Sequence, residues 1–202
     1  MFDMISKYRN SSKSIVSILA TPFILLGFTP LAVTLLSLPF AILFLLSIIH
    51  GNFLFAFFFG VLALMMDAID GTVAKKCGSV SLFGNYIDAV VDKVIDFILI
   101  SSFVFYFPVE TVITLGCSFL ASYAKPRVAL VIATDNRDWP GIGERGDKMV
   151  ILLSGVLLAV FFGVLIMRPV LWLVTTVAVV GFFQRISYAR RLIKEKEVFL
   201  DR

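Results

Sequence analysis

The sequence predicts an all-α integral membrane protein with six transmembrane helices, preceded by an N-terminal amphipathic helix at the membrane interface. Of its 202 residues, 59% are hydrophobic and 16% are charged, and the mean hydropathy is +0.98. A soluble domain could not cover that much apolar surface. Several apolar runs also approach or exceed the roughly 20 residues that cross the hydrocarbon core of a bilayer. We therefore expect a single membrane domain over residues 1–202.

The N-terminal segment, residues 1–28, is expected to lie on the membrane surface. Its first residues are polar and basic, and no small-residue cleavage site follows a short apolar core, so we expect no signal peptide. Residues 15–28 form an apolar run of about half a membrane thickness, interrupted by Pro22 and mixed with Ser and Thr. These properties are typical of an interfacial helix.

The six-helix core is expected over residues 31–188, with polar or Pro- and Gly-containing turns between the apolar runs. The second span continues as a helix beyond the apolar region, so its carboxylates collect at one end. A basic tail, residues 189–202, follows the last span. The expected spans are residues 31–49, 53–76, 82–107, 111–132, 147–167 and 170–188.

The basic residues predict the orientation of this core. With six spans, every Lys and Arg except Arg168 falls on the side of the two termini. Because Lys and Arg are enriched in short cytoplasmic connections, we expect cytoplasmic termini in a multi-pass cell-membrane protein. The net charge of +4 does not indicate nucleic-acid binding, since the basic residues flank apolar spans. His50, the only histidine, falls on the opposite side and is expected to be a polar interfacial residue.

Four carboxylates lie within or at the ends of apolar segments: Asp67, Asp70, Asp88 and Asp92. An ionised carboxylate there costs about a few kcal/mol, which a cation, a partner or a water-filled cavity usually offsets. On a helix the first two share a face with Gly71 and Ala74, while the last two lie one turn apart on the next helix. The small residues leave room for a phosphate or ring to approach the backbone.

Oxygen-only ligation by clustered Asp favours a hard cation such as Mg²⁺, Mn²⁺ or Ca²⁺ over zinc. We expect two ions, either Mg²⁺ or Mn²⁺, because four carboxylates exceed what one Mg²⁺ usually takes from a protein and paired ions suit phosphoryl chemistry. Each Asp taken alone could instead be a helix cap or pair with Lys75, Lys76 or Lys93. A cation carrier or channel is a further alternative, but it would need carboxylates near mid-membrane.

The pattern Asp-x2-Asp-Gly-x2-Ala-Arg-x8-Gly-x3-Asp-x3-Asp is typical of the CDP-alcohol phosphotransferases, and the chain resembles this family over nearly its whole length. One position departs, because Lys75 replaces the family's Arg and lacks the guanidinium fork that binds phosphate at two points. The resemblance implies transfer of a phosphatidyl-type group from a CDP-linked lipid to an alcohol, with release of CMP. The matching residues are Asp67, Asp70, Gly71, Ala74, Gly84, Asp88 and Asp92.

The resemblance also implies roles for these residues. Asp67, Asp70 and Asp88 would be the principal metal ligands. Asp92 would be the general base that deprotonates the acceptor hydroxyl and also a ligand of the second ion. The family is typically dimeric, so we expect a homodimer. The nucleotide and CDP-lipid would be bound by Thr34, Asp70, Gly71, Ala74, Lys75 and Gly84.

Three basic residues, Lys125, Arg145 and Arg185, lie in segments that resemble the phosphatidylinositol-phosphate and archaetidylinositol-phosphate synthases. In that subgroup such residues form a pocket for the phosphate of inositol 1-phosphate, and Asp96 also fits the subgroup. A neutral acceptor such as serine or free inositol gives no reason for three cations, whereas each charge-assisted contact selects for a phosphate. The implied acceptor is inositol 1-phosphate, and glycerol 3-phosphate is the alternative.

Overall fold

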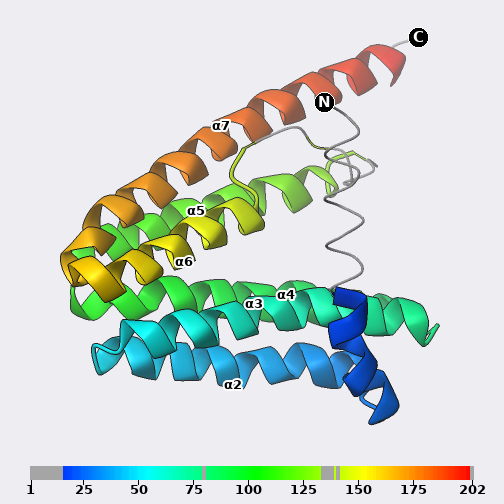
Figure 1. Ribbon diagram of the computed structural model, residues 1–202. Helices are drawn as coiled ribbons and strands as arrows, with labels where there is room; N and C mark the ends of the chain where they lie inside the picture. Colours follow the sequence, from blue (N-terminus) through cyan, green and yellow to red (C-terminus); the bar gives the residue numbers. More distant parts are fainter. Residues whose placement is uncertain (1–15, 79–80, 133–138, 140–141, 201–202) are drawn as a thin grey trace, which may run out of the picture. The chain divides into compact units, whose positions relative to one another are not determined.

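The computed structural model describes residues 16–78, 81–132, 139 and 142–200, and every regular element within them is a helix (Figure 1). This confirms the all-α prediction. The chain divides into two compact units, Met1–Leu99 and Ile100–Arg202, which are described separately below. Residues 1–15 of the expected interfacial segment lie outside the described residues, and its remainder contains the short apolar helix Val16–Leu25.

The helix boundaries follow the turn residues closely. The expected third span, residues 82–107, is not one continuous α-helix. Its α-helix ends at Ser101 and a 3-10 turn follows before Pro108, whose ring suits the first position of the next helix. The last helix continues through the expected basic tail. The elements are α2 (Pro30–Ile49), α3 (Phe53–Lys76), α4 (Leu82–Ser101), η1 (Ser102–Phe105), α5 (Pro108–Val128), α6 (Arg145–Phe162), η2 (Val164–Ile166) and α7 (Met167–Leu200).

In the first unit, α2 and α3 lie side by side and the short helix Val16–Leu25 packs against them. The hydroxyl of Thr29 accepts a hydrogen bond from the backbone of Ala32, and Pro30 occupies the first turn, which together start α2. Lys76 Nζ donates to the carbonyl of Ser17 at 3.2 Å and ties the end of α3 to the short helix. The shared core is formed by Ala20, Val33, Met66, Ile69 and Val73.

In the second unit, α5 and α6 both pack against α7. The hydroxyls of Thr114 and Thr175 lie 2.8 Å apart in the buried α5–α7 contact. Arg168 Nε donates to Glu110 Oε1 at 2.6 Å, which satisfies the buried carboxylate at the start of α5. Gly163, with φ +77°, ends α6, a conformation that favours glycine.

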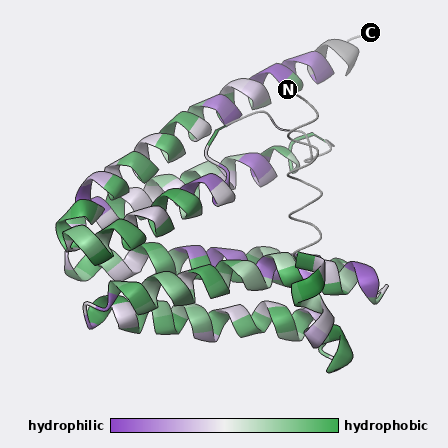
Figure 2. Cartoon of the chain, viewed as in Figure 1, coloured by the Kyte–Doolittle hydropathy of each residue, from purple (hydrophilic) through white to green (hydrophobic). Residues whose placement is uncertain are grey.

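Three helices within the described residues are long and apolar enough to cross a membrane: Pro30–Ile49, Phe53–Lys76 and Val164–Lys196. Among the other helices, α4 carries four charged residues along its length, Asp88, Asp92, Lys93 and Asp96, which interrupt its apolar sequence. Figure 2 shows the same contrast, with hydrophobic colour along most helices and hydrophilic colour toward the C-terminal end of α7. The protein therefore has the character of a membrane protein, while the six-span count and the amphipathic interfacial helix stay predictions.

Gly181 of α7 packs closely against the backbone of Ile142, so we expect a larger residue at position 181 to destabilise the protein. A Cβ at residue 181 would collide with the backbone carbonyl of Ile142, which cannot rotate away like a side chain. We expect Gly181→Ala to lower the free energy of unfolding by about 1–3 kcal/mol, measured as an earlier thermal transition in detergent. Gly116→Ala on α5 is the matched control, because its Cβ would meet nothing within 4 Å. Equal transitions for the two variants would contradict this packing.

Candidate functional site

Three aspartates of the first unit converge where α3 ends and α4 begins. One carboxylate oxygen from each of Asp67, Asp70 and Asp88 lies within 4.8 Å of the others. Asp70 is the most buried of the three, with 4% of its surface exposed. The hydroxyl of Thr34, on α2, donates a hydrogen bond to Asp70 Oδ2 and so fixes that carboxylate. Three helices thus contribute to the cluster.

The start of α4 determines where Asp88 lies. Ser81 Oγ accepts a hydrogen bond from the backbone of Gly84 at 2.9 Å, and its carbonyl accepts one from Asn85 at 3.1 Å. The first bond satisfies one of the donors that a helix N-terminus leaves open, and the second is the first regular hydrogen bond of the helix. A Cβ at residue 84 would lie 2.9 Å from Ser81 Oγ, so a larger residue would crowd the cap. The helix begins at Leu82, nearly two turns before Asp88.

A cavity of about 490 Å³ lies beside the three carboxylates, within the range of small-molecule sites. A Cβ at Gly71 would meet nothing within 4 Å, so the space next to its Cα is open to a ligand. Lys75 and Asp67 are not among the described residues that line the cavity, and Lys75 is exposed. The expected nucleotide residues that do line it are Thr34, Asp70, Gly71, Ala74 and Gly84.

Two further residues of this cavity were not singled out from the sequence. Ser81 and Asn85 also line it. Gly84 was the available signal for Ser81 and Asn85. A glycine in the first turn of a helix lets a ligand come close to the backbone, so the residues near that glycine also lie near the ligand. Thr29, which with Pro30 resembles the family's entry to the first span, also lines the cavity, and its capping role places it at that end of α2.

The donor set at the three aspartates fits a hard divalent cation. All three contribute only carboxylate oxygens, and their separations allow a shared ion. A buried carboxylate such as Asp70 also needs a compensating charge or donor, and the described Thr34 hydroxyl supplies only one hydrogen bond. Asp92, half-buried one turn beyond Asp88, is not a member of this convergent group.

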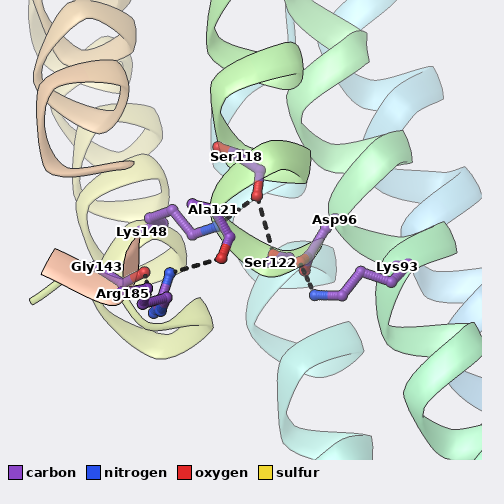
Figure 3. A network of polar contacts seen from close by, with 8 residues as sticks. All are labelled: Lys93, Asp96, Ser118, Ala121, Ser122, Gly143, Lys148 and Arg185. Carbon is purple, nitrogen blue, oxygen red and sulfur yellow. Dashed lines mark hydrogen bonds and ion pairs between the residues drawn. The ribbon is translucent and has the colours of Figure 1, made fainter. Parts of the chain in front are cut away.

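Asp96 lies one further turn along α4 and is 4% exposed. Lys93 Nζ lies 3.5 Å from Asp96 Oδ2, and this ion pair joins two neighbouring positions of the same helix (Figure 3). Asp88, Asp92 and Asp96 follow one another at intervals of four residues, so all three lie on the same polar face of α4.

The three expected acceptor cations belong to the second unit, where Arg185 is the central residue. Its guanidinium donates to the carbonyl of Ala121 at 2.9 Å and to that of Gly143 at 3.2 Å (Figure 3). These carbonyls lie four residues before Lys125 and two residues before Arg145. The backbone segments that carry the three cations therefore meet at Arg185, which is itself 7% exposed.

The start of α6 fixes the position of Arg145. Asp147 Oδ2 accepts hydrogen bonds from the backbones of Gly143 and Glu144, and Glu144 accepts one from the third residue of the helix, which forms a capping box. Gln184 Oε1 accepts from the backbone of Ile142 at 2.9 Å and joins the same segment to α7. Arg145 is half-buried as the first residue of α6.

Lys148 is a buried cation that sequence reasoning did not single out. It is 1% exposed, and its Nζ donates to the carbonyl of Ser118 at 3.5 Å (Figure 3). Lys148 lies three residues after Arg145, so both side chains are on one face of α6. This spacing was the sequence signal that could have placed Lys148 near the expected acceptor cations. The same face of α5 therefore receives Lys148 from α6 and Arg185 from α7, one turn apart.

Comparison with known proteins agrees with this architecture. Over 195 residues the chain is 26% identical to the archaetidylinositol phosphate synthase of Pyrococcus horikoshii, covering 95% of this chain and 99% of the relative. It is 28% identical to the phosphatidylinositol phosphate synthase of Mycobacteroides abscessus, covering 90% and 86%.

The fold matches crystal structures of the phosphatidylinositol phosphate synthase of Mycobacterium tuberculosis. The structure with bound CDP-DAG superposes with a TM-score of 0.75 at 23% identity, covering 87% of this chain and 94% of the other. The structure in complex with manganese and citrate gives 0.74 at 23% identity, covering 86% and 88%.

A family model, CDP-alcohol phosphatidyltransferase, matches residues 28–183. This range includes the aspartate cluster, most of the cavity beside it and most of the second unit. The match confirms the resemblance given by the aspartate motif, and the members of the family are transferases of phospholipid synthesis. The chain belongs to the CDP-alcohol phosphatidyltransferase family.

Proposed function

We propose that the enzyme transfers a phosphatidyl-type group from a CDP-linked lipid to inositol 1-phosphate and releases CMP. The observation that carries the proposal is the convergence of Asp67, Asp70 and Asp88 beside a cavity lined by Gly71 and Ala74. The names of the two relatives support an inositol phosphate acceptor, and the CDP-DAG bound to the tuberculosis enzyme supports the donor.

The first unit is assigned to the donor. Thr34 holds the buried Asp70 carboxylate, and the open space next to Gly71 admits the nucleotide end of the lipid close to the α3 backbone. Asp67, Asp70 and Asp88 would hold divalent cations, which we propose to be two Mg²⁺ or Mn²⁺ ions; manganese in the tuberculosis structure supports this choice. When bound, such ions neutralise pyrophosphate charge and stabilise the leaving group.

Asp92 is assigned as the general base. It lies on α4 one turn beyond Asp88, so its carboxylate belongs to the same polar face but not to the convergent group. The acceptor hydroxyl oxygen forms a bond to the lipid-linked phosphorus while the bond from that phosphorus to the bridging pyrophosphate oxygen breaks. CMP takes the bridging oxygen, and the hydroxyl proton passes to Asp92.

The second unit is assigned to the acceptor phosphate through Lys125, Arg145 and Arg185. The two carbonyl bonds of Arg185 hold its guanidinium in place, which reduces the ordering cost of binding a phosphate. The same cations could serve glycerol 3-phosphate, which also carries a phosphate monoester, and this is the second candidate acceptor. The two differ in the polyol rather than in the charge.

The proposed topology has six spans with the termini and the active site on the cytoplasmic side. Besides the three strongly apolar helices, α4, α5 and α6 contain 20, 21 and 18 residues. At 1.5 Å per residue, each is roughly 27–32 Å long, close to the thickness of the hydrocarbon core. A homodimer is also proposed, as is usual for the family.

The acceptor is tested directly by CMP release. Purified enzyme with CDP-lipid and Mg²⁺ should release CMP with inositol 1-phosphate, and much less with serine or free inositol, because only the phosphorylated acceptors engage the cations. Release with glycerol 3-phosphate should be lower than with inositol 1-phosphate, because the two acceptors differ in the polyol. Chelation with EDTA should abolish release. Preference for glycerol 3-phosphate would establish the second candidate, and release with every acceptor alike would contradict phosphate selection.

Asp92→Asn should lower kcat by about 10²–10⁴-fold, because the amide cannot accept the hydroxyl proton. The substitution preserves size, so binding of the CDP-lipid, measured by titration calorimetry in detergent, should stay within about twofold of wild type. Normal CMP release by this variant would remove the base assignment.

Arg145→Ala should raise KM for inositol 1-phosphate by about 10–100-fold through loss of a charge-assisted contact, with KM for the CDP-lipid nearly unchanged. Arg191→Ala is the control, because this exposed arginine of α7 pairs only with Glu195 among the contacts assigned to it. The measurement is steady-state kinetics with each substrate varied in turn. Equal rises in both KM values would contradict an acceptor role.

A further inference from the structure

A second groove lies within the second unit, between the end of α5 and the C-terminal half of α7. Its volume is about 730 Å³, and of the residues assigned to the reaction only Arg185 reaches it. Its walls are largely apolar, with Val128 from α5 and Phe182, Ile186 and Ile193 from α7. The groove therefore offers a long hydrophobic surface that the transfer reaction does not use.

Three exposed cations border the same groove: Arg127 from α5, and Arg190 and Lys194 from α7. None of the described residues that line it is acidic, so these charges are not balanced inside the groove. A water-soluble phosphate would leave the apolar walls uncovered, and a neutral lipid would leave the cations without a counterion. A ligand that satisfies both has an apolar chain and an anionic head.

The position of the groove along α7 agrees with this ligand. The helix has 34 residues and is about 51 Å long, whereas the hydrocarbon core is about 30 Å thick. Its C-terminal part therefore extends past the core, and Figure 2 shows its colour turning hydrophilic there. Ile186, Ala189 and Ile193 share one face of that extension, beside Arg190 and Lys194. Such a surface lies at the depth of lipid headgroups.

We propose that this groove binds one anionic phospholipid. An acyl chain lies along the apolar walls, and the phosphate is held by Arg127, Arg190 and Lys194. Basic pockets between membrane helices bind acidic headgroups in this way. The inference rests on the second unit alone and does not depend on the identity of the acceptor or on the aspartate cluster.

Native mass spectrometry of the full chain in detergent tests the site, with phosphatidylglycerol and phosphatidylcholine of identical acyl chains as probes. Wild type should bind phosphatidylglycerol more tightly. Arg190→Gln/Lys194→Gln should lower that affinity by about fivefold for each charge removed. Arg191→Gln/Lys196→Gln removes the same charge from the same helix outside the groove and should stay within about twofold of wild type. Circular dichroism checks that both variants keep their helices.

A second variant tests the apolar part. Ala189→Phe places a ring in the groove while every cation is retained, and it should lower phosphatidylglycerol affinity at least fivefold. The proposal is overturned if the two double variants lose affinity equally, if the two lipids bind alike, or if Ala189→Phe binds normally. It is also overturned if glycerol 3-phosphate displaces the lipid, or if the groove variants change the oligomeric mass instead, since the occupant is then a soluble phosphate or a second copy.

Discussion

The cost of placing carboxylates in apolar helices shapes the first unit of this protein. Asp70 lies almost fully buried on α3, and its charge must be met by donors or cations. Thr34 on α2 donates to it, and Asp88 on α4 brings a second carboxylate close. A cation bound among these carboxylates would offset their mutual repulsion. The capped start of α4 and the glycines beside the cavity are arranged around that requirement.

Much of this arrangement could be predicted from local sequence. The observed helices begin within three residues of the expected starts, because Pro30 and Pro108 favour a first helical turn and polar turns separate the apolar runs. The aspartate spacing likewise predicted which carboxylates share a face. The 3-10 turn after Ser101 was missed, because the apolar run continues through it without a glycine or proline before Pro108.

The sequence could not predict which group forms a hydrogen bond with each buried polar side chain. Thr34 and Asp70 are 36 residues apart, and nothing in their local pattern indicates their hydrogen bond. The same is true of Arg185, whose two carbonyl partners come from α5 and from the segment before α6. Lys148 was overlooked for a related reason, because a lysine near a helix start usually remains solvated. Tertiary contacts give these residues their environments.

The length of α7 has a mechanical consequence. From residue 182 to residue 200 the sequence contains neither glycine nor proline, so the helix has no residue at which it would readily bend. Arg185 lies within this unbroken stretch of helix. A tilt or rotation of the outer end of α7 would therefore move the Arg185 guanidinium, together with the backbone carbonyls of Ala121 and Gly143 that accept its hydrogen bonds. A force applied to the outer end of α7 would in this way reach the polar interior of the second unit.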